Sequence, residues 1–115
     1  MQVLNQTRGT VLVRQGHLAD TFWTRLRGLL GSRPLTNGQG LVLKNEKSIH
    51  TFFMTFSIDV IYANDRLRVI RLDKDMRPYR LGPFVRDAAY ILELPVGTID
   101  ASRTVVNDQL SFQMA

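Results

Sequence analysis

The chain has 115 residues and no cysteine, which excludes disulfide bonds, thiol catalysis and cysteine-ligated metal sites. No apolar run approaches the ~18 to 20 residues that a membrane span needs, and the start lacks the basic-then-apolar pattern of a signal peptide. Repeats, low-complexity tracts and linkers are also lacking. We therefore expect one cytoplasmic domain over residues 1–115, with no membrane span.

Charge of one sign is only mildly in excess. The chain carries 15 Lys and Arg against 10 Asp and Glu, for a formal net charge of +5. All of the excess lies in residues 1–57, with seven bases and two acids, while residues 58–115 hold eight of each. No run of five like charges forms a basic tail. The composition favours solvated arginines, and nucleic-acid binding through the basic first half stays open as an alternative.

Helical periodicity occurs in one segment. Apolar residues at helical spacing lie between a candidate N-cap, Asp20, and a candidate C-terminal glycine, Gly31. This pattern predicts one amphipathic helix over about residues 20–30. Arg25 and Arg27 would lie on the two sides of its apolar face.

Strand signals fill most of the remaining chain. Short apolar or alternating runs occur at 3–6, 10–14, 41–43, 50–56, 58–63, 67–72, 89–94 and 109–113. We expect six or seven short strands from them, an irregular segment over 73–88 and a helical turn over 98–103. The fold class is therefore α+β, mostly β, with a small, strongly twisted sheet or partly closed barrel and one amphipathic helix.

A hairpin is predicted around Asn64-Asp65, because both residues tolerate the left-handed conformation of tight turns. A two-residue turn there would place Tyr62 opposite Leu67, and Val60 opposite Val69. Asp59 would then point to the other face of the hairpin.

Familiar chemical motifs are missing. The chain has no G-x-G-x-x-G, Walker A, H-E-x-x-H or G-x-S-x-G pattern, so the sequence signatures of the most common enzyme classes are absent. No cofactor is predicted. The remaining candidates are polar residues within apolar strands. His50 shares a predicted strand face with Phe52, Met54 and Phe56, where it would act as acid, base or ligand, or be a hydrogen-bonded core histidine.

Three carboxylates complete the candidate set. Asp59 and Glu93 lie in apolar strands and must be paired or hydrogen-bonded, since burying an isolated charge is very costly. Arg25 or Arg27 could be the partner, either shaping a site or tying the helix to the sheet. Asp108 follows Asn107 and is expected to cap a turn.

Together, the histidine and the three carboxylates would suit a hard or borderline cation. No two of them have ligand spacing on one predicted element, so no metal site is predicted.

Several motifs resemble a small uncharacterised family, catalogued as domain of unknown function one-ninety-two. They are RLRGLL at 25–30, IHTFFM at 49–54, IDV at 58–60, LELPVG at 92–97 and Asn107-Asp108. The resemblance covers about residues 15–113 and implies a compact, mostly β single domain with no known reaction. The positions it carries over are Arg25, Arg27, Gly28, His50, Met54, Asp59, Glu93, Gly97 and Asp108.

Two departures from the family pattern stand out. Asn107 occupies a position that is usually glycine, and asparagine is the next best residue for a left-handed turn. Relatives often have a cysteine just before the Ser-Ile-His segment, where this chain has Glu46 or a neighbour, so a thiol-dependent role is in doubt here.

The sequence favours a non-enzymatic binding or accessory module for a small ligand or a protein partner. Its ligand-binding candidates are Arg25, Arg27, His50, Asp59, Glu93 and Asp108. The first alternative is an acid-base or metal-assisted hydrolase that uses His50 with Asp59 or Glu93.

Overall fold

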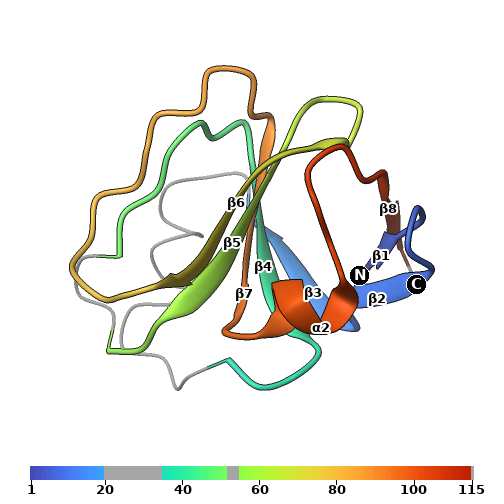
Figure 1. Ribbon diagram of the computed structural model, residues 1–115, viewed down its shortest axis with the longest axis horizontal. Coiled ribbons are helices and arrows are strands. Elements are labelled where there is room, and N and C mark those ends of the chain that lie inside the picture. Colours follow the sequence, from blue (N-terminus) through green and yellow to red (C-terminus); the bar gives the residue numbers. More distant parts are fainter. Residues whose placement is uncertain (20–34, 52–54, 115) are drawn as a thin grey trace.

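The computed structural model describes residues 1–19, 35–51 and 55–114. The described elements, in chain order, are β1 Gln2–Asn5, β2 Thr10–Val13, β3 Gln15–Ala19, β4 Gln39–Lys44, β5 Ile58–Ala63, β6 Val69–Met76, β7 Tyr90–Pro95, α2 Thr98–Ser102 and β8 Leu110–Gln113. They form a three-stranded sheet, β2-β1-β8, and a five-stranded sheet, β3-β4-β7-β5-β6 (Figure 1). The expected mostly β fold with a small sheet is confirmed, as two open sheets.

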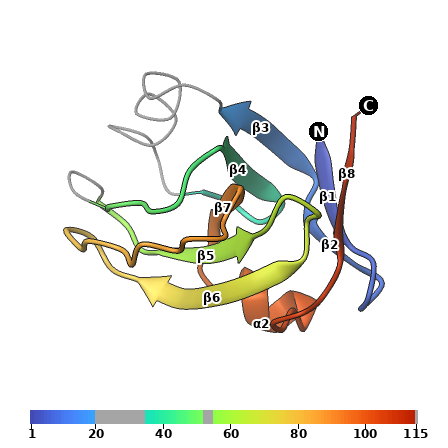
Figure 2. The same cartoon turned by 90° about the horizontal axis from the view of Figure 1, so that it is seen from above.

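β5 is buried on both faces of the large sheet, which explains why all of its residues except Asp59 are apolar or aromatic. On one face, Leu92 and Ile61 pack with Val3 and Leu110 of the small sheet and with Ile99 of α2. On the other face, a second cluster of buried residues includes Leu43, Tyr62 and Ile91 of the sheet, and Ile49 and Ala88 of the loops. Figure 2 shows the small sheet standing at one end of the large one.

The predicted hairpin forms, but its predicted register is wrong. Tyr62 pairs with Arg71 and Val60 pairs with Asp73, because the connection spans residues 64–68. The Asn64 side chain causes this longer loop: its Oδ1 accepts hydrogen bonds from the backbone N–H groups of Arg66 and Arg68.

Three other strand predictions need correction. β6 begins at Val69 and continues to Met76, so the strand predicted over 67–72 ends too early and the irregular segment predicted over 73–88 begins too early. No strand covers the described residues of 50–56, where His50 makes only an isolated bridge with Leu81. β3 was not predicted, because Gln15-Gly16-His17 has no apolar alternation and its strand depends on parallel pairing with β4.

The expected helical turn over 98–103 is present as α2. The predicted helix over 20–30, with Arg25, Arg27 and Gly28, lies outside the described residues, and so do Phe52 and Met54. Within the described ranges, no helix is long and apolar enough to cross a membrane.

Candidate functional site

Asp59 lies in β5, beside Leu94 of β7, and is only 2% exposed. Its Oδ1 accepts a hydrogen bond from the N–H of Asp75 at 2.9 Å. Its Oδ2 accepts bonds from the N–H groups of Gly97 at 3.1 Å and Ile99 at 3.0 Å. Three backbone donors offset the cost of burying the carboxylate. Asp59 thus fixes the turn that leads from β7 into α2.

Asp108 is equally buried and joins two distant segments. Its Oδ2 accepts hydrogen bonds from Asn5 Nδ2 at 3.0 Å, Arg8 Nε at 3.1 Å and the Val105 N–H at 3.0 Å. Burial alone would raise the pKa of this carboxyl, but the hydrogen bonds from Asn5, Val105 and Arg8 outweigh burial and hold the pKa below its ordinary value. Asn107 has a φ of 79°, so it adopts the left-handed turn expected for that position.

The described candidates do not surround one pocket. Glu93 in β7 pairs with Val60, the neighbour of Asp59, so Glu93 and Asp59 point to opposite faces of the large sheet. His50 is exposed, at its bridge with Leu81. In residues 1–19, 35–51 and 55–114, no three His, Asp or Glu residues could hold a metal ion. His50, Asp59, Glu93 and Asp108 therefore do not assemble the cation site considered above.

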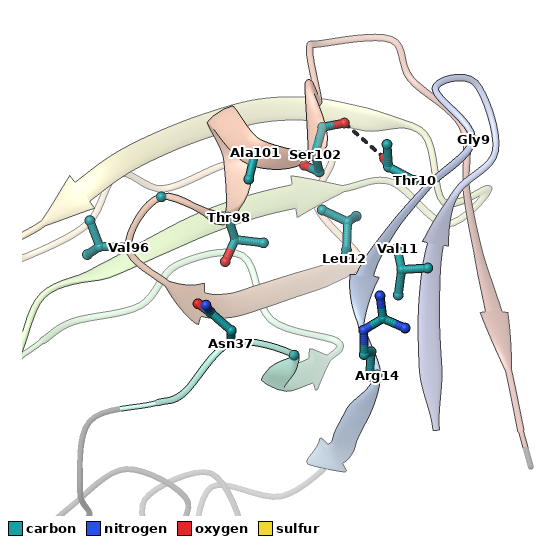
Figure 3. A pocket seen from close by; sticks show the side chains of 12 residues that line it. Gly9, Thr10, Val11, Leu12, Arg14, Asn37, Val96, Thr98, Ala101 and Ser102 are labelled. Carbon is teal, nitrogen blue, oxygen red and sulfur yellow. Dashed lines mark hydrogen bonds between the residues drawn. The ribbon is translucent and has the colours of Figure 1, made fainter.

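A different site is formed by three turns. A cavity of about 580 Å³ lies where these turns meet (Figure 3). Its first wall is β2 together with the β1–β2 turn, its second is the turn that precedes β4, and its third is the segment that leads from β7 into α2. This volume falls within the roughly 300 to 1,000 Å³ that is typical of small-molecule sites. Of the candidates that the structure describes, His50, Asp59, Glu93 and Asp108 do not line this cavity, whereas Gly97 of the LELPVG motif does.

Glycine backbone forms part of the cavity wall at each turn. Gly9, Gly38 and Gly97 have φ angles of 67°, 88° and 95°, and they are all the positive-φ glycines in the described ranges. All three line the cavity. A Cβ added to Gly9 or Gly97 would meet no atom within 4 Å and would project into open space. The absence of side chains there lets a ligand approach the backbone closely.

Arg14, which directly follows β2, is the charged residue among the described residues of the lining. Its stem packs beside Gly38, where an added Cβ would lie 3.5 Å from Arg14 Cβ and Cδ. Its guanidinium makes no hydrogen bond or ion pair with any residue that the structure describes, and the same holds for the side chain of Asn37. Figure 3 shows these two side chains across the cavity from Thr98 and Ala101.

The threonine hydroxyl groups that line the cavity donate hydrogen bonds to backbone carbonyl groups of the protein. Thr10 Oγ1 donates to the Ser102 carbonyl at 2.9 Å, and Thr98 Oγ1 donates to the Pro95 carbonyl at 2.7 Å. Their protons are therefore used, and their lone pairs remain to accept hydrogen bonds. Arg14 and Asn37 supply N–H donors opposite them.

The buried carboxylates hold the walls of this cavity in place. Asp59 fixes Gly97 directly. Asp108 bonds Asn5 and Arg8 at the β1–β2 turn, and Asn5 also donates to Thr104 Oγ1, which shares a hydrogen bond with Ser102. The sequence singled out Asp59 and Asp108 as ligand-binding candidates but not Arg14, since nothing distinguishes it from the other bases of the first half. Its place as the last residue of the predicted strand run 10–14 was the available signal.

The described fold is similar to that of a solved protein of unknown function from Novosphingobium aromaticivorans. The two share 18% sequence identity at a TM-score of 0.83, over 97% of this chain and 84% of the other. This likeness concerns the fold alone.

Two curated relatives are UPF0127 proteins. The protein of Thermococcus sibiricus is 35% identical over 97% of this chain and 75% of its own length. The protein of Pyrococcus furiosus is 34% identical over 96% of this chain and 97% of its own length. The family model of DUF192, described as "Uncharacterized ACR", matches residues 3–112. The resemblance seen in the motifs is confirmed, and the chain belongs to the DUF192 family.

Proposed function

We propose that the protein is a binding module whose site is the cavity between β2 and α2, and that its ligand is a small molecule with a carboxylate or phosphate group. The observation that carries this proposal is the convergence on one cavity of three positive-φ glycines and the guanidinium of Arg14, which pairs with none of the residues that the structure describes.

An anionic ligand fits the charge of the lining. Among the described residues, the lining contains Arg14 and no acidic side chain. The supporting carboxylate of Asp59 is already bonded to three backbone N–H groups. A guanidinium presents a fork of donors that matches the oxygens of a carboxylate or phosphate. The lone pairs of Thr10 and Thr98 would accept hydrogen bonds from hydroxyl groups elsewhere on the ligand.

The hydrolase alternative has less support. Both oxygens of Asp59 accept backbone hydrogen bonds, and this residue is buried. Glu93 points to the opposite face of the sheet, and His50 is exposed on a loop. A general base must reach the proton that it abstracts, so this arrangement favours a non-enzymatic role.

Isothermal titration with inorganic phosphate, citrate and a sugar phosphate tests the proposal. Arg14→Gln should weaken binding of the best ligand by at least about tenfold, because a hydrogen bond to a charged group contributes about 1.5 to 3 kcal/mol. Arg66→Gln is the matched control, since Arg66 is also exposed but lies in the β5–β6 turn. Equal affinities for the Arg14→Gln variant and the wild type would contradict the proposal.

A further inference from the structure

A second surface lies on the segment that follows β6, toward the end of the large sheet away from β1, β2 and β8 (Figures 1 and 2). Three large apolar side chains are exposed there: Tyr79 by 61%, Leu81 by 76% and Phe84 by 71%. Exposed apolar residues grouped within six positions are unusual, whereas scattered ones are not. This cluster therefore requires an explanation.

The segment is held by backbone bonds to residues 47–51. Thr51 is fully buried, and its hydroxyl donates to the Arg77 carbonyl at 2.6 Å while accepting the Arg80 N–H at 2.8 Å. The Tyr79 N–H also donates to the Thr51 carbonyl at 2.9 Å. These bonds hold Tyr79 at a φ of 59°, a left-handed conformation that is uncommon for a bulky residue.

The other side of the segment is fixed in the same way. The Gly82 N–H donates to the Ile49 carbonyl at 2.9 Å, and the Val85 N–H donates to the Lys47 carbonyl at 2.7 Å. A Cβ on Gly82 would lie 2.7 Å from that Ile49 oxygen, so glycine permits the close approach. The fold thus exposes Leu81 and Phe84 on a loop that these hydrogen bonds already hold in place. Binding a partner would therefore cost little conformational entropy of the loop.

Basic side chains flank the apolar ones. Arg77, Arg80 and Arg86 are exposed, and their guanidinium groups pair with none of the described residues. No acidic residue occurs from 76 to 86, and Asp87 is the first to follow. The surface therefore combines three exposed apolar side chains with three cationic groups. A partner that fits it must offer both an apolar environment and negative charge.

The geometry points to the surface of an anionic lipid bilayer as that partner, with Leu81 and Phe84 entering the headgroup region and Arg77, Arg80 and Arg86 binding lipid phosphates. Leucine and phenylalanine insert into the interface, and bases beside them are attracted to anionic headgroups. Single-stranded nucleic acid fits less well, because Leu81, the most exposed of the three, has no ring on which a base could stack.

Vesicle flotation tests this inference, with phosphatidylcholine alone and with phosphatidylcholine and phosphatidylserine in equal amounts. The wild type should bind the mixed vesicles more tightly, and added salt should weaken the binding. Leu81→Ser with Phe84→Ser should reduce binding by at least about tenfold, as expected for removing buried apolar area. Arg80→Gln should reduce it by about fivefold, from about 1 kcal/mol for each base near an anionic surface.

Matched controls are Val106→Ser and Arg66→Gln, which alter exposed residues outside this segment and should bind like the wild type. Urea unfolding of each variant checks that the fold is intact.

A second measurement is amide line broadening in the wild type by nitroxide-labelled lipid, which should be strongest at residues 79–86. Failure of the wild type to bind mixed vesicles, or full binding by the doubly substituted variant, would overturn the inference. Binding to an oligonucleotide that Arg80→Gln weakens and Leu81→Ser does not would assign the surface to nucleic acid instead.

Discussion

The backbone N–H of Gly97 donates to Asp59 Oδ2 at 3.1 Å, joining the exposed wall of the cavity to a buried carboxylate of the central sheet. Asp59 also binds the N–H of Ile99 and of Asp75, so one side chain ties together β5, the end of β6 and the start of α2. The shape of the cavity therefore depends on a residue that does not line it.

Asp59→Asn should lower the free energy of unfolding by at least about 2 kcal/mol, because the amide NH₂ would face a backbone N–H donor and leave it unsatisfied. Urea unfolding measures this loss. Asp65→Asn is the control, since Asp65 is exposed in the β5–β6 turn and should change the midpoint little. An Asp59→Asn variant as stable as the wild type would show that the three backbone bonds do not stabilise the fold.

The stability of the protein should fall in acid through Asp108. The folded-state pKa of this carboxyl is held below its ordinary value of 3.8, so its stabilising contribution is present above 3.8 and is lost as the pH falls toward the folded pKa. Urea midpoints of the wild type should therefore decrease below pH 3.8. The Asp108→Asn variant should show a shallower decrease, and identical pH profiles would contradict the prediction.

Tyr62 should respond to alkali with the opposite sign. Burial raises the pKa of its hydroxyl well above the ordinary 10.0, and the hydrogen bond that it donates to Asp73 at 2.9 Å adds to the rise. Its stabilising contribution is thus present below pH 10.0 and is lost as the pH rises toward the folded pKa. Tyr62→Phe should cost about 1 kcal/mol at neutral pH. The difference between variant and wild type should shrink in alkaline urea titrations, and a constant difference would refute this assignment.

Gly97→Ala should have two separable effects. The φ of 95° makes alanine unfavourable by about 1 to 2 kcal/mol, which thermal unfolding measures. The new methyl group would project into the open space of the cavity and should also weaken ligand binding. Asn107→Ala is the matched control, because Asn107 has a φ of 79° but does not line the cavity. The Asn107→Ala variant should lose stability without losing affinity for the ligand. Equal losses of affinity in both variants would show that backbone strain, and not the new methyl group in the cavity, weakens binding.

The strands that were predicted from sequence are those with apolar periodicity of their own. β5 and β7 are recognisable because their runs are buried on both faces. β3 was missed because its formation depends on pairing with β4, and Gly16 within it packs so closely to Val13 that a Cβ would lie 2.8 Å from Val13 Cγ1. Such tertiary contacts leave no local pattern.

The site was less predictable than the fold. The burial of Asp59 and Glu93 followed correctly from their apolar strands, at 2% and 3% exposure. The partners of Asp59 are backbone N–H groups far along the chain, which no residue spacing reveals. The cavity likewise arises where three separate turns meet, so Arg14 could be assigned to it only from the structure.

Amide chemical shifts during titration with the tightest anion found by calorimetry test the central claim most directly. We predict perturbations at Gly9, Gly38 and Gly97, and their loss in Arg14→Gln. Perturbations that spare these three glycines would contradict the assignment of the cavity as the binding site.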